Sequence, residues 1–300
     1  MSTNRFRTRF RLATFFLLVL LLAPGTVGQA QPRPQPPSAT ADNHAPLLHD
    51  RGPGVSTSMF GTYIRGGEWL VYPFFEHYRD HDFEYKPNEL GAEGETDHRG
   101  RFRAREGLLL VAYGLTNDLA VEFEAAYIHA SLTKASADTS NLPPTTSESG
   151  VGDVEGQIRW RWRRETASRP ELFSYAEFVV PHHRNRPLTG TAGWEVKAGT
   201  GLIRGFRWGT LTARAALEYS SASSSHVDVG EYAVEYLKRL HPRWRVYLGL
   251  EGTQDEISAI AEVQWNLARH VFAKFNNGVG LTSKATDWAP EIGVVFSWPR

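Results

Sequence analysis

Strict alternation of apolar and polar side chains constrains this sequence more than any other feature. It is clearest in two adjacent runs, 243–252 and 256–267, where Trp244, Leu248 and Trp265 belong to the apolar set. Because a period of two places successive side chains on opposite faces of a strand, the runs predict a β-hairpin with one apolar and one charged face. Each limb is long enough to cross a bilayer at a tilt.

Comparable alternation recurs from Glu68 to Trp298 and predicts twelve strands. They cover approximately residues 68–79, 103–114, 118–130, 153–164, 171–181, 193–203, 209–220, 228–239, 243–252, 256–267, 271–282 and 289–298. Bacterial outer-membrane barrels have an even number of strands, with long outer loops and short periplasmic turns. Long connectors (80–102, 131–152 and 182–192) alternate with short ones over the first half of this region. The predicted fold class is all-β, a transmembrane antiparallel β-barrel of about twelve strands.

Aromatic residues gather at one end of this predicted barrel. They open or close strands on the periplasmic side and share the parity of the lipid-facing residues: Trp69, Tyr113, Trp162, Tyr236, Trp244, Trp265 and Trp298. Amphipathic rings collect where a bilayer meets water, so these residues predict a membrane-interface girdle. A soluble β-sandwich gives no reason for this placement, and we therefore favour the barrel.

The N-terminal region predicts export. Four arginines precede the apolar run Leu12–Ala23, and the small residues Gly28 and Ala30 follow it. This is the pattern of a secretory signal peptide over residues 1–30, and the run is too short for a spanning helix. We therefore expect residues 68–300 to form a barrel in the outer membrane of a Gram-negative-type bacterium, in contact with outer-membrane lipid.

Residues 31–67 predict a short unstructured periplasmic segment before the barrel. The first part is rich in proline and polar residues, as in a solvated linker. The apolar residues Met59, Phe60, Tyr63 and Ile64 leave two interpretations open: a short lid against the periplasmic mouth, or a lead-in to the first strand. We expect the segment to be too short for a folded plug, so that transport runs passively down a gradient.

The second face of the predicted strands carries the charged residues. An arginine or lysine on the lipid face near the bilayer centre costs about 2–4 kcal/mol, so these side chains are assigned to the lumen. The candidate lumen-lining residues are Glu122, Glu124, Glu155, Arg159, Arg161, Glu177, Glu195, Lys197, Arg214, Glu218, Glu231, Glu235, Arg243, Arg245, Glu251, Glu262, Lys274 and Glu291. Two interpretations stay open: the charges fill and rigidify a narrow barrel, or they line a solute path. Glu231 and Glu235, with Arg243 and Arg245 on the next strand, predict a charged ladder along one wall.

Composition and local motifs argue against several other functions. The chain has no cysteine, which excludes disulfides and thiolate chemistry. Acidic and basic residues are equal in number (33 each), which argues against nucleic-acid binding. No motif indicates a cofactor.

Two groups of residues resemble sites but are better explained as solvated loops. His77, His81 and His98 lie near several aspartates, and His182 precedes His183, yet their spacing does not predict a metal site. The stretch Ser223–Asp228 contains the residue types of a hydrolase triad, but contiguity in sequence is weak evidence for one. The H-x-S-N-G pattern of barrel phospholipases is absent from the sequence. We therefore expect neither a metal site nor enzyme activity.

The motif Gly150-Val151-Gly152-Asp153, which opens a predicted strand, and the alternating hairpins over 68–298 carry a family resemblance. They resemble the outer-membrane barrels grouped with the MetA pathway of phenol degradation and related transporter-type barrels. The resemblance implies a narrow passive channel for small solutes, apolar or aromatic ones included. Two alternatives stay open: a structural or partner-binding barrel with a closed lumen and, less favoured, a membrane-embedded hydrolase. The solute and the oligomeric state are not specified by these residues.

Overall fold

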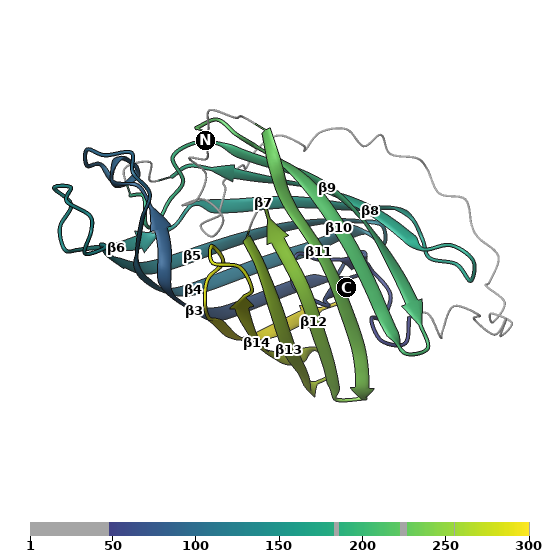
Figure 1. Ribbon diagram of the computed structural model, residues 1–300. Coiled ribbons are helices and arrows are strands. Elements are labelled where there is room, and N and C mark those ends of the chain that lie inside the picture. Colours follow the sequence, from purple (N-terminus) through teal and green to yellow (C-terminus); the bar gives the residue numbers. More distant parts are fainter. Residues whose placement is uncertain (1–47, 183–185, 223–226, 255, 300) are drawn as a thin grey trace, which may run out of the picture.

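The computed structural model describes residues 48–182, 186–222, 227–254 and 256–299. Most of the chain in these ranges is extended, and the strands wind obliquely around one barrel (Figure 1). The expected signal peptide and most of the proline-rich linker fall in residues 1–47, outside the described residues. No helix in the described ranges is long and apolar enough to cross a membrane.

Twelve antiparallel strands close this barrel, as predicted. β6 and β7 both pair with β5, on either side of a break at Gly152–Asp153, and therefore form one interrupted strand. β15 pairs with β3 and completes the ring. The bounds are β3 (Trp69–Tyr85), β4 (His98–Thr116), β5 (Leu119–Thr133), β6 (Thr145–Val151), β7 (Val154–Arg163), β8 (Glu171–Val180), β9 (Glu195–Phe206), β10 (Gly209–Ser220), β11 (Val227–His241), β12 (Trp244–Thr253), β13 (Glu256–Ala268), β14 (Val271–Gly280) and β15 (Ala289–Trp298).

The two ends of the barrel differ in their connections. At one end, here named the turn end, short turns join β4 to β5, β9 to β10, β11 to β12 and β13 to β14. At the other, the loop end, the connections include 86–97, 134–144 and 181–194. The first of these loops contains a short 3₁₀ helix, η1 (Pro87–Leu90). This asymmetry matches the sequence expectation for the first half of the barrel, and it weakens toward the C-terminus, where the loop-end connection between β12 and β13 is short.

Three strands run further toward the loop end than the sequence predicted. β3 continues to Tyr85, β4 begins at His98 and β5 continues to Thr133. The alternation persists in these extensions, but outward residues such as Arg79 and Arg101 are charged, which favoured a loop assignment. The lipid-facing apolar band of such a barrel is only about 25 Å tall, so strand segments beyond it no longer need apolar residues outside.

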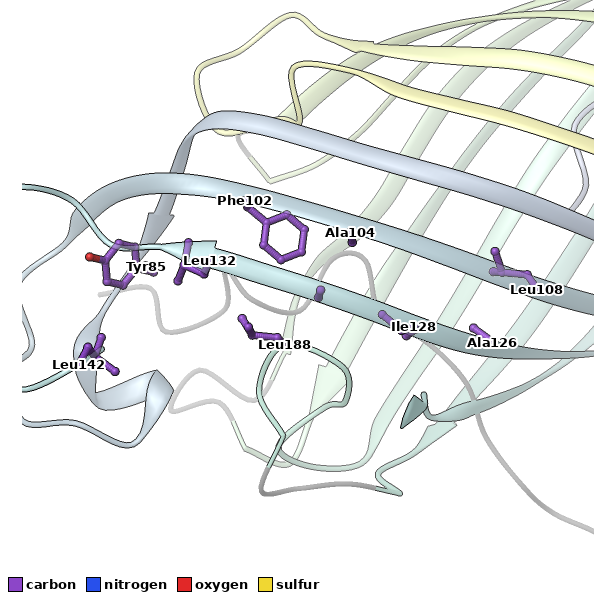
Figure 2. Close-up of a cluster of buried hydrophobic side chains, with 10 residues drawn as sticks. Tyr85, Phe102, Ala104, Leu108, Ala126, Ile128, Leu132, Leu142 and Leu188 are labelled. Carbon is purple, nitrogen blue, oxygen red and sulfur yellow. The ribbon is translucent and has the colours of Figure 1, made fainter. Parts of the chain in front are cut away.

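Apolar side chains inside the loop end are covered by two loops. Figure 2 shows Leu142, from one loop, beside Tyr85, and Leu188, from the other, close to Phe102; all belong to one buried cluster that includes Ile128. Leu188 and Ile128 are fully buried. The loop-end extension of β3–β5 therefore has a small hydrophobic core of its own.

Asp153 of the glycine-containing motif fixes the loop that carries Leu188. Its buried carboxylate accepts hydrogen bonds from the backbone N–H groups of Thr191 and His182, and from Thr191 Oγ1 at 2.7 Å. At the neighbouring Gly152, a Cβ would lie 2.7 Å from Ile128 Cδ1, so a side chain is disfavoured there. In this structure the motif breaks a strand and anchors an outer loop.

The two faces of the barrel wall follow the predicted parity. Large apolar residues such as Phe75, Leu109 and Leu248 are exposed on the outside, whereas Lys274 and Glu262 are buried inside. The charged pair is stabilised by a contact of 3.1 Å between Lys274 Nζ and Glu262 Oε2. A barrel of this kind is turned inside out relative to a water-soluble protein, with its apolar surface directed outward.

A short hairpin lies inside the barrel near the turn end. β1 (Val55–Ser56) and β2 (Tyr63–Ile64) pair antiparallel on either side of the tip 57–62, and we call residues 55–64 the inner hairpin. Val55 and Ile64 are fully buried against wall residues of β3 and β4. The sequence left two interpretations open for these residues, a lid against the periplasmic mouth or a lead-in, and the structure places them inside the lumen. The apolar residues of the segment bury themselves in the lumen instead of remaining in water.

Leu248→Arg should destabilise the inserted barrel by about 2–4 kcal/mol, because it places a charge on the lipid-facing side near the middle of a strand. Leu248 is 53% exposed on the outside of β12. The matched control, Ser258→Arg, places the same charge inside, next to Glu251 in the strand pairing. Unfolding in lipid bilayers, followed by heat-modifiable electrophoretic mobility, measures both variants. Equal losses would show that the assignment of inside and outside is wrong.

Candidate functional site

A cavity of about 370 Å³ lies inside the barrel, directly above the inner hairpin. Ser58, Met59 and Phe60 at the hairpin tip form its floor on the turn-end side. Inward side chains of the barrel strands form its walls. Between this floor and the wall near the turn end lies a space of about 20 Å³. Among the described residues, the inner hairpin therefore occupies the lumen below the cavity.

One wall of the cavity is aromatic and apolar. Tyr72 and Phe74 on β3 stack at 4.4 Å between ring centroids, and Leu108 and Leu110 lie next to them on β4. These residues belong to the inward face of each strand, in the half nearer the turn end. The wall offers a surface against which a flat apolar group can pack.

The opposite wall is charged. In a ring of twelve strands, β10 and β11 lie across from β3 and β4. Arg214 on β10 contacts Glu231, lies 2.7 Å from Glu235 and 3.4 Å from Glu251. Lys197 on β9 lies 3.2 Å from the same Glu231. The result is a continuous network of alternating charge across four strands.

This network differs from the ladder predicted between Glu231 and Glu235 on one strand and Arg243 and Arg245 on the next. Arg243 is exposed in the turn between β11 and β12, so its inward assignment was wrong. Arg245 is buried, but its strand partner is Arg239. The alternation gave the correct face for Arg245, and the register between strands decided its neighbours.

The structure places the other predicted lumen residues inside the barrel, where they fall into three groups. Those that line the cavity are Glu124, Glu155, Arg159, Glu177, Lys197, Arg214, Glu231, Glu251 and Glu291. Glu122, Arg161, Glu195, Arg245, Glu262 and Lys274 are buried elsewhere in the interior. Glu235 faces the small space beside the inner hairpin, and half-buried Glu218 has the inward parity of β10.

Sequence reasoning missed an acidic row on the cavity wall. Glu291, Glu76 and Glu106 are direct partners on the adjacent strands β15, β3 and β4. All three line the cavity, on the loop-end side of Tyr72 and Leu110. In the sequence, Glu76 and Glu106 occupy positions that point inward. Their role was not recognised, because the arginines at the alternate positions before Glu106 made this stretch look charged on both faces.

Arg51 ties the base of the inner hairpin to the barrel wall. Its Nη2 lies 3.1 Å from Glu165 Oε2 and 3.0 Å from Glu171 Oε2, and all three side chains are buried. Burial by itself lowers the pKa of Arg51, but neighbouring Tyr63 and the two carboxylates raise it above its ordinary value. Arg51 therefore stays charged. Arg161 adds a hydrogen bond to the carbonyl of Gly54.

The tip of the inner hairpin binds both sides of the lumen. On β5, Glu122 accepts hydrogen bonds from Ser58 N at 2.8 Å and from Ser58 Oγ. Across the barrel, the carbonyl of Phe60 accepts one from Gln264 Nε2 at 3.0 Å. The Phe60 ring stacks on Tyr247 with 4.9 Å between centroids. These contacts fix the hairpin across the barrel, so its position is specific.

The predicted aromatic girdle occupies the turn end. Trp69 and Tyr113 are strand partners 4.5 Å apart, and Trp244 and Trp265 stack at 5.2 Å. Trp298 is the strand partner of Trp69 on the other side. Tyr236 and exposed Trp162 lie at the turn end of their strands. Aromatic rings thus mark the turn end on two groups of three neighbouring strands, β15–β3–β4 and β11–β12–β13, and on β7.

The residues that resembled metal or hydrolase sites are dispersed. His81 pairs with Asp287 at 2.7 Å, and His98 lies 3.8 Å from Asp138. Within the described ranges, no three His, Asp or Glu side chains are close enough together to hold a metal ion. His183 and Ser223–His226 lie outside the described residues, and Asp228 is on β11.

Comparisons with known proteins support the fold. No protein-family model and no curated protein sequence matches the chain. The COG4313 outer-membrane channel of Pseudomonas putida F1 has a similar structure, with 14% identity, a TM-score of 0.59, and coverage of 81% of this chain and 100% of that chain. The translocator domain of the autotransporter NalP from Neisseria meningitidis follows, with 10% identity, a TM-score of 0.50, and coverage of 78% and 89%. The Ralstonia pickettii toluene transporter TbuX has 10% identity and a TM-score of 0.44, with coverage of 79% and 90%.

At such identities the first two likenesses show a shared fold, that of an outer-membrane-type β-barrel. The resemblance inferred from Gly150–Asp153 to the phenol-degradation barrels therefore stays a prediction at the level of family. The fold alone is common to channels and to a translocator domain.

Arg51→Ala should loosen the inner hairpin while the barrel stays folded. Removing one partner of a buried ion pair typically costs about 3–5 kcal/mol, because the remaining charge is left uncompensated. Amide hydrogen exchange over residues 55–64 should therefore accelerate. The control Arg164→Ala breaks a 2.6 Å contact with Asp118 that is largely exposed, and should change exchange little. Unchanged protection in Arg51→Ala would contradict the anchoring role.

Proposed function

We propose that this protein is an outer-membrane channel that takes small solutes into the cavity, and that the inner hairpin closes its turn end. The observation that carries the proposal is the cavity itself, which lies inside a closed barrel and is bounded below by Ser58–Phe60. The structural likeness to an outer-membrane channel with a TM-score of 0.59 supports it. In this proposal the barrel encloses the path of the solute, and the inner hairpin determines whether that path is open at the turn end.

The exterior surface supports insertion in a bilayer with the loop end outward. Exposed apolar residues such as Phe75, Leu109 and Leu248 surround the barrel, and the aromatic band marks one edge of this surface. Long loops face the outside in such barrels. Solutes would then enter the cavity from the loop end and leave on the periplasmic side when the hairpin is displaced.

The two walls favour an amphipathic solute. Tyr72, Phe74 and Leu108 can pack against an apolar or aromatic body, and the wall at Arg214 can bind polar groups. Nine carboxyl groups line the cavity against three cationic side chains (Arg159, Lys197 and Arg214). Rows of carboxylates favour cations over anions. The proposed solute class is therefore small, apolar or aromatic on one side, and neutral or cationic.

A second candidate function is a structural barrel with a closed lumen. It is favoured by one observation: the inner hairpin occupies the lumen below the cavity and is bonded to opposite sides of the wall by Ser58 and Phe60. In that case the cavity is only an outward-facing recess. The two functions differ in whether displacement of the hairpin opens a path.

Planar-bilayer recordings of purified protein test this difference. Wild type should show small conductance, and Arg51→Ala should show larger or more frequent openings because its hairpin is released. The folded state of each variant is checked by heat-modifiable mobility. Silence in both proteins, with folded barrels and accelerated exchange of the hairpin, would favour the structural barrel.

Cation preference should depend on the acidic row. In a salt gradient the reversal potential of Arg51→Ala should indicate selectivity for cations. Introducing Glu76→Gln and Glu291→Gln into the same variant should reduce that selectivity. The matched control replaces Glu93 and Glu95, which are exposed in the loop 86–97, with glutamine. An unchanged reversal potential in the cavity variant would remove the acidic row from the conduction path.

A further inference from the structure

An exposed row of arginines runs along the outside of β4 at the loop end. Arg101, Arg103 and Arg105 alternate with buried Phe102 and Ala104 and point away from the lumen. On β3, exposed Arg79 is the direct partner of Arg103. Four guanidinium groups are thus gathered on two neighbouring strands.

Protein carboxylates do not neutralise this row. Within the described ranges, no Asp or Glu forms an ion pair with Arg101, Arg103 or Arg105. By contrast, Arg99 on the same face contacts Asp82 at 2.6 Å. Like charges directly opposite each other on adjacent strands are destabilising. The row therefore gains stability from an anion supplied by its surroundings.

The neighbours of the row on β5 are hydrogen-bonding groups. His129 is the strand partner of Arg105, and Ser131 is the partner of Arg103. On the other side, His77 is the partner of Arg105. Hydroxyl, imidazole and guanidinium groups are all able to donate to phosphate oxygens, and arginine does so with two parallel bonds.

The height of the row matches the edge of the apolar band. Tyr113 marks the aromatic band at the turn end, and Arg105 follows eight residues away along β4. At about 3.3 Å per residue and a tilt of about 40°, this separation is about 20 Å along the barrel axis. Arg101 lies about 30 Å away by the same estimate, whereas the apolar band is about 25 Å tall. The row thus straddles the lipid–water boundary at the loop end.

An apolar notch lies directly below Arg105. Gly107 is the next outward residue on β4, and its strand partners are Phe75 and Tyr127, both exposed. A Cβ at Gly107 would meet no atom within 4 Å. Gly107 therefore leaves open space between two exposed aromatic side chains, and we call this position the Gly107 notch.

We propose that the arginine row and the Gly107 notch bind a phosphorylated lipid in the leaflet at the loop end. Its headgroup phosphates contact Arg101, Arg103 and Arg105, and one acyl chain lies in the notch. The proposal rests on the membrane orientation given above, and it is independent of solute passage. A lipid is favoured over a free anion because charged and apolar elements adjoin at the bilayer boundary.

The test compares wild type with a variant that carries Arg101→Gln, Arg103→Gln and Arg105→Gln. Native mass spectrometry in detergent measures binding of a diphosphorylated lipid A, its dephosphorylated form and phosphatidylcholine. Wild type should prefer the diphosphorylated lipid, and the variant should bind it about tenfold less tightly or worse. The control replaces Arg207 and Arg269, exposed at the turn end, with glutamine and should bind as wild type does.

Two further arms separate the lipid from a free anion. Gly107→Leu fills the notch and should weaken lipid binding while all four arginines remain. Millimolar inorganic phosphate should compete only weakly in wild type. The proposal is overturned if the arginine variant, shown to be folded by heat-modifiable mobility, binds the diphosphorylated lipid as tightly as wild type. It is equally overturned if the dephosphorylated lipid binds as well, or if inorganic phosphate displaces the lipid completely. Since binding is measured in detergent, failure of the channel recordings does not affect the result.

Discussion

Backbone hydrogen bonding between β15 and β3 is the constraint on which the rest of the structure depends. In lipid every backbone N–H and C=O group must find a partner within the protein, so a sheet that spans a bilayer has to close on itself. Closure leaves each strand with one face toward lipid and one toward the lumen. The ionisable residues that the strands carry within the apolar band are therefore confined to one narrow interior, where cations and carboxylates have to be arranged next to one another.

The interior meets this requirement with charge networks that include the inner hairpin. Arg214 is shared among Glu231, Glu235 and Glu251, and Arg51 is shared between Glu165 and Glu171. A buried ion pair contributes little net stability, because desolvation offsets most of the attraction, but a partner left alone is costly. These pairs consequently specify where the hairpin sits more than they stabilise the barrel. A closing element held in this way can be released when its partners are exchanged or solvated, as a gate requires.

The outside of the barrel follows the opposite rule. There the apolar residues face lipid, and the exposed arginines of β3 and β4 lie at or beyond the loop-end edge of the apolar band. Inside the barrel, Arg51, Arg159 and Arg214 have protein carboxylates as partners, whereas Arg101, Arg103 and Arg105 depend on what surrounds the barrel. The same residue type thus serves to fix the lumen on one face of the wall and to contact the bilayer boundary on the other.

The sequence by itself determined the twelve-stranded barrel, the face of residues such as Leu248 and Lys274, and the aromatic band, because a period of two is a local property of each strand. It did not reveal the insertion of the inner hairpin, since Arg51 meets Glu165 and Glu171 across 114 and 120 residues of chain. Nor did it reveal the acidic row, because Glu291 and Glu76 become neighbours only when the last strand pairs with the first. Which residues adjoin across strands depends on register and closure, and these are decided by the whole ring at once.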